Sequence, residues 1–168
     1  MTVDRDELRE TMRLWTSGIT IVTTAAGDRR AGVTVSSFTS VSLEPPLILV
    51  CLQKGITALE IIQDSRVFAV SLLRAGQSPI SAQFAGFTLL PEGADRFYQV
   101  PTLTAVTGAP ILRDALAWLD CRVYTIVDGG GSEIVLGEVV ATERRPDLQP
   151  LVYHNRGYYT LLPESPGS

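Results

Sequence analysis

Apolar residues change their spacing along this chain, and the spacing predicts helices only at the margins of a β-rich fold. Near the start, Leu8, Met12 and Trp15 recur at intervals typical of one face of a helix. Asp4 caps the beginning of this helix, and Ser17-Gly18 ends it. We therefore expect one amphipathic helix before the first strand.

Most of the remaining chain has the alternating or β-branched pattern of strands. Turn residues separate these runs, and Asp128 to Gly131 forms the turn of the clearest hairpin. Glu44-Pro45-Pro46 ends the second run, because proline cannot continue a central strand. The last six residues, 163–168, are expected to be frayed. The predicted strands cover residues 19–24, 32–43, 47–52, 66–73, 115–127, 133–142 and 157–162.

Two further helices are predicted between the strands. One begins with a capping box of Thr57 and Glu60, and the other with Ser78 as its cap and Phe84 on its length. Residues 86–110 carry little periodicity and predict a long excursion with at most one short strand, a kind of loop that often has a function. Strands at regular intervals with helices at the edges indicate a single domain over residues 1–168, mainly β, built as an antiparallel barrel.

Composition and charge exclude several classes of function. With 168 residues, 45% of them hydrophobic and 19% charged, the chain is typical of a globular domain. A net charge of −4 argues against binding to nucleic acid, which needs a basic face. The longest apolar run, near residues 45–52, is too short to span a bilayer, and the first ten residues are too charged for a signal peptide.

The few residues suited to metal binding or nucleophilic catalysis form no known motif. Cys51, Cys121 and His154 lack the spacing of a zinc site, so no metal is predicted. Both cysteines lie in apolar runs, which favours buried, reduced thiols in a cytoplasmic protein. No Rossmann, P-loop or GxSxG motif occurs, and Gly129 to Gly131 is better explained as a flexible turn than as a phosphate loop.

One extended run is unusually rich in hydroxyl groups. Thr34, Ser36, Ser40 and Ser42 fall on one face, and valines fall mostly on the other. The alternation fails at Ser37 and Thr39, where a bulge or kink is expected. Two interpretations remain open: a solvated strand face, or a flat wall with hydrogen-bonding groups that suits a planar heteroaromatic ring.

This run lies within a longer resemblance to a known family. Residues 16–24 and 32–47 resemble the flavin reductase-like family, whose members include the reductase components of two-component flavin-dependent monooxygenases. The resemblance covers nearly the whole chain in order, continuing through residues 68–73, Gln77, residues 83–85, 115–123, 136–139 and 150–154.

The resemblance implies a split-barrel, Greek-key FMN-binding fold, a homodimer, and reduction of FMN or FAD by NADH or NADPH. A separate flavin-dependent monooxygenase is the implied partner. The cofactors carry the hydride chemistry, so no catalytic acid or base is assigned. The flavin-binding positions carried over from the family are Thr34, Val35, Ser36 and Ser37 at the ring, Cys51, Leu52 and Gln53 along the ring and ribityl chain, Lys54 to Thr57 at the phosphate, and Phe84 and Ala85 near the other end.

Two features make the expected phosphate site unusual. A phosphate at the helix that begins at Thr57 would meet free N–H groups, with Lys54 as an added cation. Glu60 lies near the same end and opposes a phosphate, while Gly55 stands where relatives often carry serine. Both features predict modest flavin affinity.

The predicted hairpin departs from the family pattern. Many members read Gly-Asp-His where this chain has Gly-Gly-Ser ending at Ser132, and that histidine is associated with the nicotinamide. Ser132, His154 and Tyr158 are the candidate nicotinamide contacts. Simpler interpretations also stay open: Cys51 and Phe84 as core residues, and His154 as a surface residue.

Two other functions remain open at this point. One is a flavoprotein that holds its flavin tightly and passes electrons to another acceptor. The other is a flavin-binding module without enzymatic activity.

Overall fold

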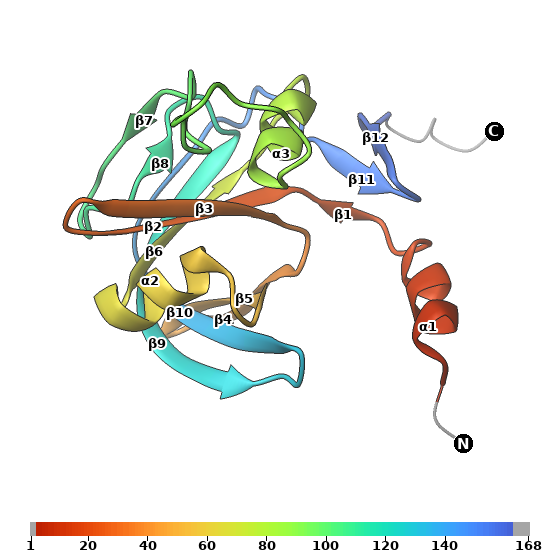
Figure 1. Cartoon of the computed structure of the whole chain (residues 1–168), viewed down its shortest axis with the longest axis horizontal. Coiled ribbons are helices and arrows are strands. Elements are labelled where there is room, and N and C mark those ends of the chain that lie inside the picture. The colour runs from red at the N-terminus through yellow and green to blue at the C-terminus, as the bar shows by residue number, and fades with distance from the viewer. Residues whose placement is uncertain (1–2, 163–168) are drawn as a thin grey trace.

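The structure, a computed structural model, describes residues 3–162. Its main element is a seven-stranded antiparallel sheet in the order β3-β2-β6-β9-β10-β5-β4. Consecutive strands β3 and β4 lie at opposite edges of this sheet, yet only Ser36 and Ser37 separate them. Because so short a crossover cannot span a flat sheet, the sheet curls into a split barrel (Figure 1). The strands are β2 (Thr20–Ala26), β3 (Arg29–Val35), β4 (Phe38–Leu43), β5 (Pro46–Gln53), β6 (Val67–Leu72), β9 (Ala117–Asp128) and β10 (Ser132–Arg144).

The barrel interior is filled by the inward-facing residues of these strands. Val22, Val50, Phe68 and Val135 are fully buried and belong to one cluster. Helix α2 (Thr57–Ser65) packs on β2 and β3 and contributes Ile62 to the same cluster. Its apolar residues recur at helical spacing, which gives one face for the barrel and leaves a polar face outside.

A second apolar cluster lies beside the barrel and supports α3 (Ser78–Phe84). Phe84 packs edge-on against Phe97 with ring centroids 5.1 Å apart. Residues 86–110 hold one short strand, β7 (Thr102–Leu103), which pairs with β8 (Ile111–Leu112) just beyond. The prediction of a long excursion with at most one short strand is confirmed.

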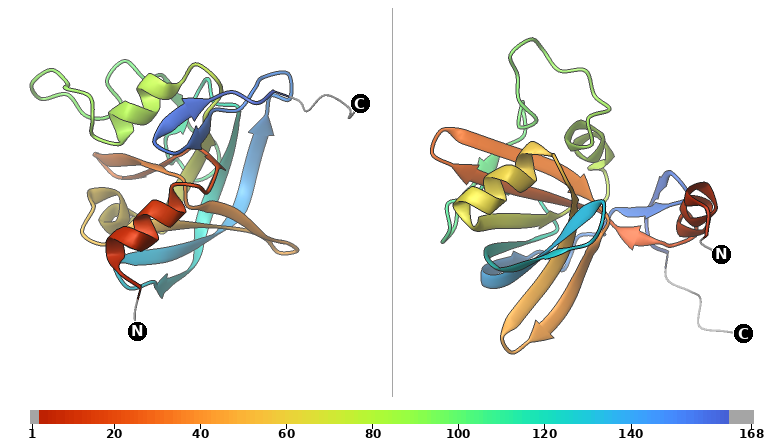
Figure 2. Two further views of the ribbon diagram at one scale, coloured as in Figure 1. Left: turned by 90° about the vertical axis from the view of Figure 1, so that its right-hand side faces the viewer. Right: turned by 60° about the horizontal axis from the view of Figure 1, so that its bottom comes forward.

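The two ends of the chain meet in a small separate sheet. Its strands are β1 (Ser17–Gly18), β11 (Val152–His154) and β12 (Gly157–Tyr159). Figure 2 shows this sheet and α1 (Arg5–Met12) projecting to one side of the barrel. No residue of α1 is buried.

The predicted first helix is confirmed at its start and corrected at its end. Asp4 caps it, and its carboxylate accepts the N–H of Asp6 at 3.1 Å. The helix ends at Met12, before Trp15, and Ser17-Gly18 forms a strand instead of a helix stop. Ser17 and Gly18 pair with β11 instead. This contact is long-range in the sequence, so local spacing cannot predict it.

The hairpin at Asp128 to Gly131 is confirmed, with a turn of residues 129–131; β9 begins two residues and ends one residue later than expected, and β10 is longer at both ends. The single run predicted over 32–43 is two strands with a break at Ser36 and Ser37, so the kink expected at Ser37 is confirmed, whereas Thr39 lies within β4. The last predicted strand, 157–162, ends at Tyr159, and β11 was not predicted. The expectation for 163–168 lies outside the described residues.

Both expected helix caps are one residue too late. Ile56 and Gln77 occupy the cap positions, so Thr57 and Ser78 are the first helical residues. Neither cap residue makes a side-chain hydrogen bond to its helix. Within residues 3–162, no helix combines the length and apolar character needed to cross a membrane.

Candidate functional site

The crossover from β3 to β4 is locked to the end of β5. The Ser37 hydroxyl donates to the Cys51 carbonyl at 2.9 Å and accepts the Cys51 N–H at 3.1 Å. Ser36 and Ser37 are both exposed, and Cys51 is half-buried. Ser36 and Ser37 therefore form an exposed polar segment at the open edge of the split barrel, which we call the ledge.

The residues on either side of this ledge point in different directions. Val35 packs against the barrel core, and Leu52 is fully buried in it, so only their backbones can face a ligand. The Thr34 hydroxyl donates to the Ser81 carbonyl of α3 at 2.7 Å. The run that was expected to present one uniform hydroxyl face thus divides into an α3 contact at Thr34 and a free ledge at Ser36.

The end of β5 lies against the start of β10. Gln53 pairs with Ser132 in the register of these strands, and the Lys54 N–H donates to the Gly131 carbonyl at 3.2 Å. The Lys54 ammonium lies 2.7 Å from the Asp128 carboxylate and 3.8 Å from that of Glu133. One predicted flavin position and one predicted nicotinamide position are therefore neighbours.

These carboxylates determine the state of Lys54. The hydrogen bond to Asp128 raises the pKa of Lys54, and the same contact lowers the pKa of Asp128. The ammonium expected at the phosphate is thus held by the hairpin, and Lys54 does not line the large pocket described below.

The N-terminus of α2 has unused hydrogen-bond donors. Ile56 at the cap position offers no side-chain acceptor. Within residues 3–162, the N–H groups of Thr57 and Ala58 donate to no acceptor, whereas Leu59 already donates to Ile56. Gly55 has φ +81°, a conformation that favours glycine, and open space lies where its Cβ would be. Such a helix start offers N–H groups and a positive dipole end to an anion.

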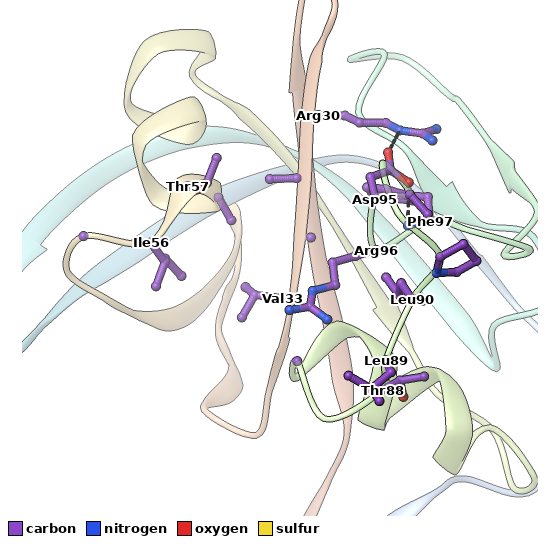
Figure 3. A pocket seen from close by; sticks show the side chains of 17 residues that line it. Arg30, Val33, Ile56, Thr57, Thr88, Leu89, Leu90, Asp95, Arg96 and Phe97 are labelled. Atoms are coloured by element: carbon purple, nitrogen blue, oxygen red, sulfur yellow. Dashed lines mark hydrogen bonds and ion pairs between the residues drawn. The ribbon is translucent and has the colours of Figure 1, made fainter.

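This helix start opens into a large pocket, shown in Figure 3. Its volume is about 790 Å³, within the range of small-molecule sites. Strand β3 forms its floor, the α2 start forms one wall, and the excursion forms the other (Figure 3). The lining includes Arg30 to Val33, Gly55 to Ala58, Gly86 and residues 88–91 and 94–97.

Arg96 brings positive charge into this pocket. Figure 3 shows its side chain extending from the excursion toward Val33 of β3. Its Nη1 donates to the Gln83 carbonyl at 3.1 Å, which fixes the guanidinium beside α3. A Cβ at Gly86 would lie 3.0 Å from Arg96 Nη2, so glycine leaves the space that the guanidinium occupies. The sequence reasoning missed Arg96, because only the return of the excursion over β3 brings it to α2.

Phe84 and Ala85 do not line the pocket. Phe84 is 3% exposed and packs on β3, where a Cβ at Gly32 would lie 2.5 Å from its ring. Phe84 is therefore a core residue in this structure. Ala85 is exposed at the C-terminal end of α3.

The other two nicotinamide candidates lie on the small sheet, away from the Ser132 hairpin. His154 Nδ1 lies 2.9 Å from the Thr16 hydroxyl. The Tyr158 hydroxyl donates to the Ser81 hydroxyl at 2.9 Å, so Tyr158 and Thr34 converge on one residue of α3. The structure thus joins Tyr158 to the flavin candidate Thr34 and leaves Ser132 beside Gln53.

The two cysteines differ from the expected pair of buried thiols. Cys121 is buried, and burial, followed by the charge of Asp120, raises its pKa to about 12. Cys51 is only half-buried, because β5 borders the open side of the barrel there. Both are free.

Comparisons with known proteins agree with this architecture. The model of the flavin reductase like domain matches residues 12–162. The FMN reductase (NADH) RutF of Enterobacter cloacae is 37% identical over 161 residues, which cover 96% of each chain.

Two solved structures are similar in sequence and in fold. The NADH:FAD oxidoreductase SgcE6 of Streptomyces globisporus, in complex with NAD and FAD fragments, has a TM-score of 0.87 and 32% identity, covering 98% of this chain and 99% of that one. A homologue of nitrilotriacetate monooxygenase component B from Mycobacterium thermoresistibile has a TM-score of 0.87 and 30% identity, covering 98% and 92%. With a family model that spans most of its length, this chain belongs to the flavin reductase-like domain family.

Proposed function

We propose that this chain is an NADH-dependent flavin reductase that takes FMN or FAD as its flavin. The supporting observation is that the Ser36–Ser37 ledge, the end of β5 and the uncapped start of α2 follow one another without a break. A flavin ring at the ledge would leave its phosphate at α2, where the N–H groups of Thr57 and Ala58 are unused among the described residues.

The residues present fit such a ligand. Gly55 leaves the approach to the helix open, the large pocket adjoins the helix start, and Arg96 supplies the cation that Lys54 does not. Glu60 is exposed in the first turn of α2, which keeps the phosphate attraction moderate. Moderate affinity suits an enzyme that releases reduced flavin as its product.

The flavin supplies the redox chemistry when it is bound, by accepting a hydride from reduced nicotinamide. The protein's part is alignment. Ser37 holds the ledge against β5, and the Lys54–Asp128 pair holds the β9–β10 turn beside it. Gln53 and Ser132, which pair across β5 and β10, would then border the two rings. Hydride transfer requires the reacting atoms to lie about 3–3.5 Å apart, so this rigidity serves the reaction directly.

We further propose that the chain acts as a homodimer and as one domain. Leu8, Met12, Leu14 and Trp15 are each more than half exposed around α1, a helix with no buried residue. Four large apolar side chains on a projecting element are costly to leave in water. A second copy of the chain would cover them.

The similarity to a monooxygenase component B homologue supports a separate flavin-dependent monooxygenase as the recipient of the reduced flavin. We place the protein in the cytoplasm, where NADH is available and the two free cysteines stay reduced.

Steady-state oxidation of NADH with added FMN or FAD tests the reductase function. We expect turnover that depends on added flavin. Oxidation of NADH that is unaffected by flavin, or none with either flavin, would refute it.

A further inference from the structure

The large pocket extends beyond the point where an FMN molecule would end. From the start of α2 it follows the floor of β3 from Val33 to Arg30. Three strand residues correspond to roughly 10 Å of additional groove. FMN ends at its phosphate, so a flavin with its phosphate at α2 leaves this length of groove unfilled.

The far end of the groove is built around Arg30 (Figure 3). Arg30 Nε donates to the Asp95 carboxylate at 2.7 Å, and the same carboxylate accepts the Phe97 N–H at 2.9 Å. The Arg30 guanidinium lies over the Phe97 ring, 4.5 Å from its centroid. These contacts fix the orientation of a planar cation at the edge of the cavity.

Part of this cation is unused. In the stretch from residue 3 to residue 162, neither Nη atom of Arg30 donates to a protein acceptor. The side chain is 45% exposed and lines the pocket. Arg30 therefore offers N–H donors and, opposite Phe97, a planar face to a ligand.

The lining between the two arginines is largely apolar. Val33 on the floor and Leu90, Pro91 and Ala94 on the excursion supply it. Apolar walls, a planar cation and a second guanidinium near the helix start match a purine base joined to phosphates. We infer that this groove is an adenylate subsite and that the chain prefers FAD to FMN. The inference rests on the proposed function.

An adenylate group could come from FAD or from NADH. The groove continues from the helix start, which the flavin phosphate occupies in the proposed function. The nicotinamide must lie over the flavin ring, near the hairpin of Ser132 at the other end of the site. The adenylate of a bound FAD would therefore continue from the flavin phosphate directly into the groove.

Binding of riboflavin, FMN and FAD to the full chain, measured by fluorescence quenching, tests the inference. We expect FAD to bind about tenfold more tightly than FMN, because the adenylate would gain hydrogen bonds from the Nη atoms of Arg30 and stacking on its open face. Arg30→Met keeps the apolar stem and should remove most of this preference for FAD. The Kd values of FMN and of riboflavin should each stay within about twofold of their wild-type values. Arg29→Met is the matched control, because Arg29 pairs with Asp64 and does not line the pocket.

A second measurement uses the wild-type protein alone, so it does not depend on whether the Arg30 variant folds. ADP should displace FAD but not riboflavin. Equal affinity for FMN and FAD, or an Arg30→Met effect that is equal for both, would overturn the subsite. The subsite would also be overturned if Arg30→Met raised the KM for NADH, measured with FMN as acceptor, and left the Kd of FAD constant. The groove would then bind NADH instead of FAD. Failure to bind any flavin would instead refute the proposed function itself.

Discussion

Gln53 and Ser132 face each other across β5 and β10, one at the end of its strand and the other at the start. This register joins the edge of the proposed flavin ring site to the hairpin at which the family resemblance predicts the nicotinamide. The contact to the pyridine nucleotide is therefore expected at Ser132, which can form hydrogen bonds but cannot stack on a ring.

Replacing Ser132 with histidine should improve the use of NADH. A single hydrogen-bonding or stacking contact contributes about 0.5–1.5 kcal/mol, so Ser132→His should lower the KM for NADH by up to about tenfold. Flavin affinity should stay nearly unchanged. Steady-state kinetics on both proteins measures this, and an unchanged or higher KM would mean that the hairpin does not contact the nicotinamide.

Removing the charge of Arg96 should weaken phosphate binding, whereas removing that of Lys54 should not. Arg96 lines the pocket, and Lys54 is held by Asp128 and Glu133. We expect Arg96→Met to raise the Kd of FMN about tenfold or more while riboflavin is unaffected, and Lys54→Met to leave both nearly unchanged. Titrations of the two variants compare them directly. A larger effect at Lys54 than at Arg96 would show that the phosphate lies at the hairpin.

A bulky side chain at Ser37 should block the flavin site. Ser37 is exposed at the ledge, so Ser37→Leu is expected to fold while it prevents the ring from approaching. Ser37→Ala is the matched control: it removes two hydrogen bonds to Cys51 and should cost about 1 kcal/mol of stability without blocking the site. Flavin titration with thermal unfolding separates the two effects. Unchanged flavin affinity in a folded Ser37→Leu protein would return the strand to the solvated-face interpretation.

The assembly depends on the apolar residues around α1. Light scattering at micromolar concentration should give the mass of a dimer. Trp15→Glu should shift it toward monomer, because Trp15 is 69% exposed in one chain and would be covered by the second. Arg5→Glu, on the same helix outside the apolar set, is the control. A monomer mass for the wild-type protein with full activity would contradict the dimer.

Local patterns in the sequence were enough for the hairpin, the α2 and α3 segments and the break near Ser37, because short-range turn and periodicity signals determine them. Strands β1 and β11 of the small sheet were missed, since Ser17 and Tyr153 pair across most of the chain. The same limit applies to the site. Ser36, Ser37 and Thr57 were proposed from the resemblance, but Arg30 and Arg96 enter the pocket only because the excursion returns over β3. Lys54 has the right spacing in the sequence for a phosphate contact, but its ammonium forms an ion pair with Asp128, which is distant in the sequence.

In the proposed reaction, electrons pass from NADH to a flavin held at this site. This transfer is measured by absorbance in the flavin band, recorded without oxygen before and after NADH is added to the protein with FMN or FAD. We expect the flavin band to bleach only when the protein is present, and its absorbance to recover fully when air is admitted. Flavin that binds and is never bleached would contradict it, and would leave a flavin-binding module without reductase activity.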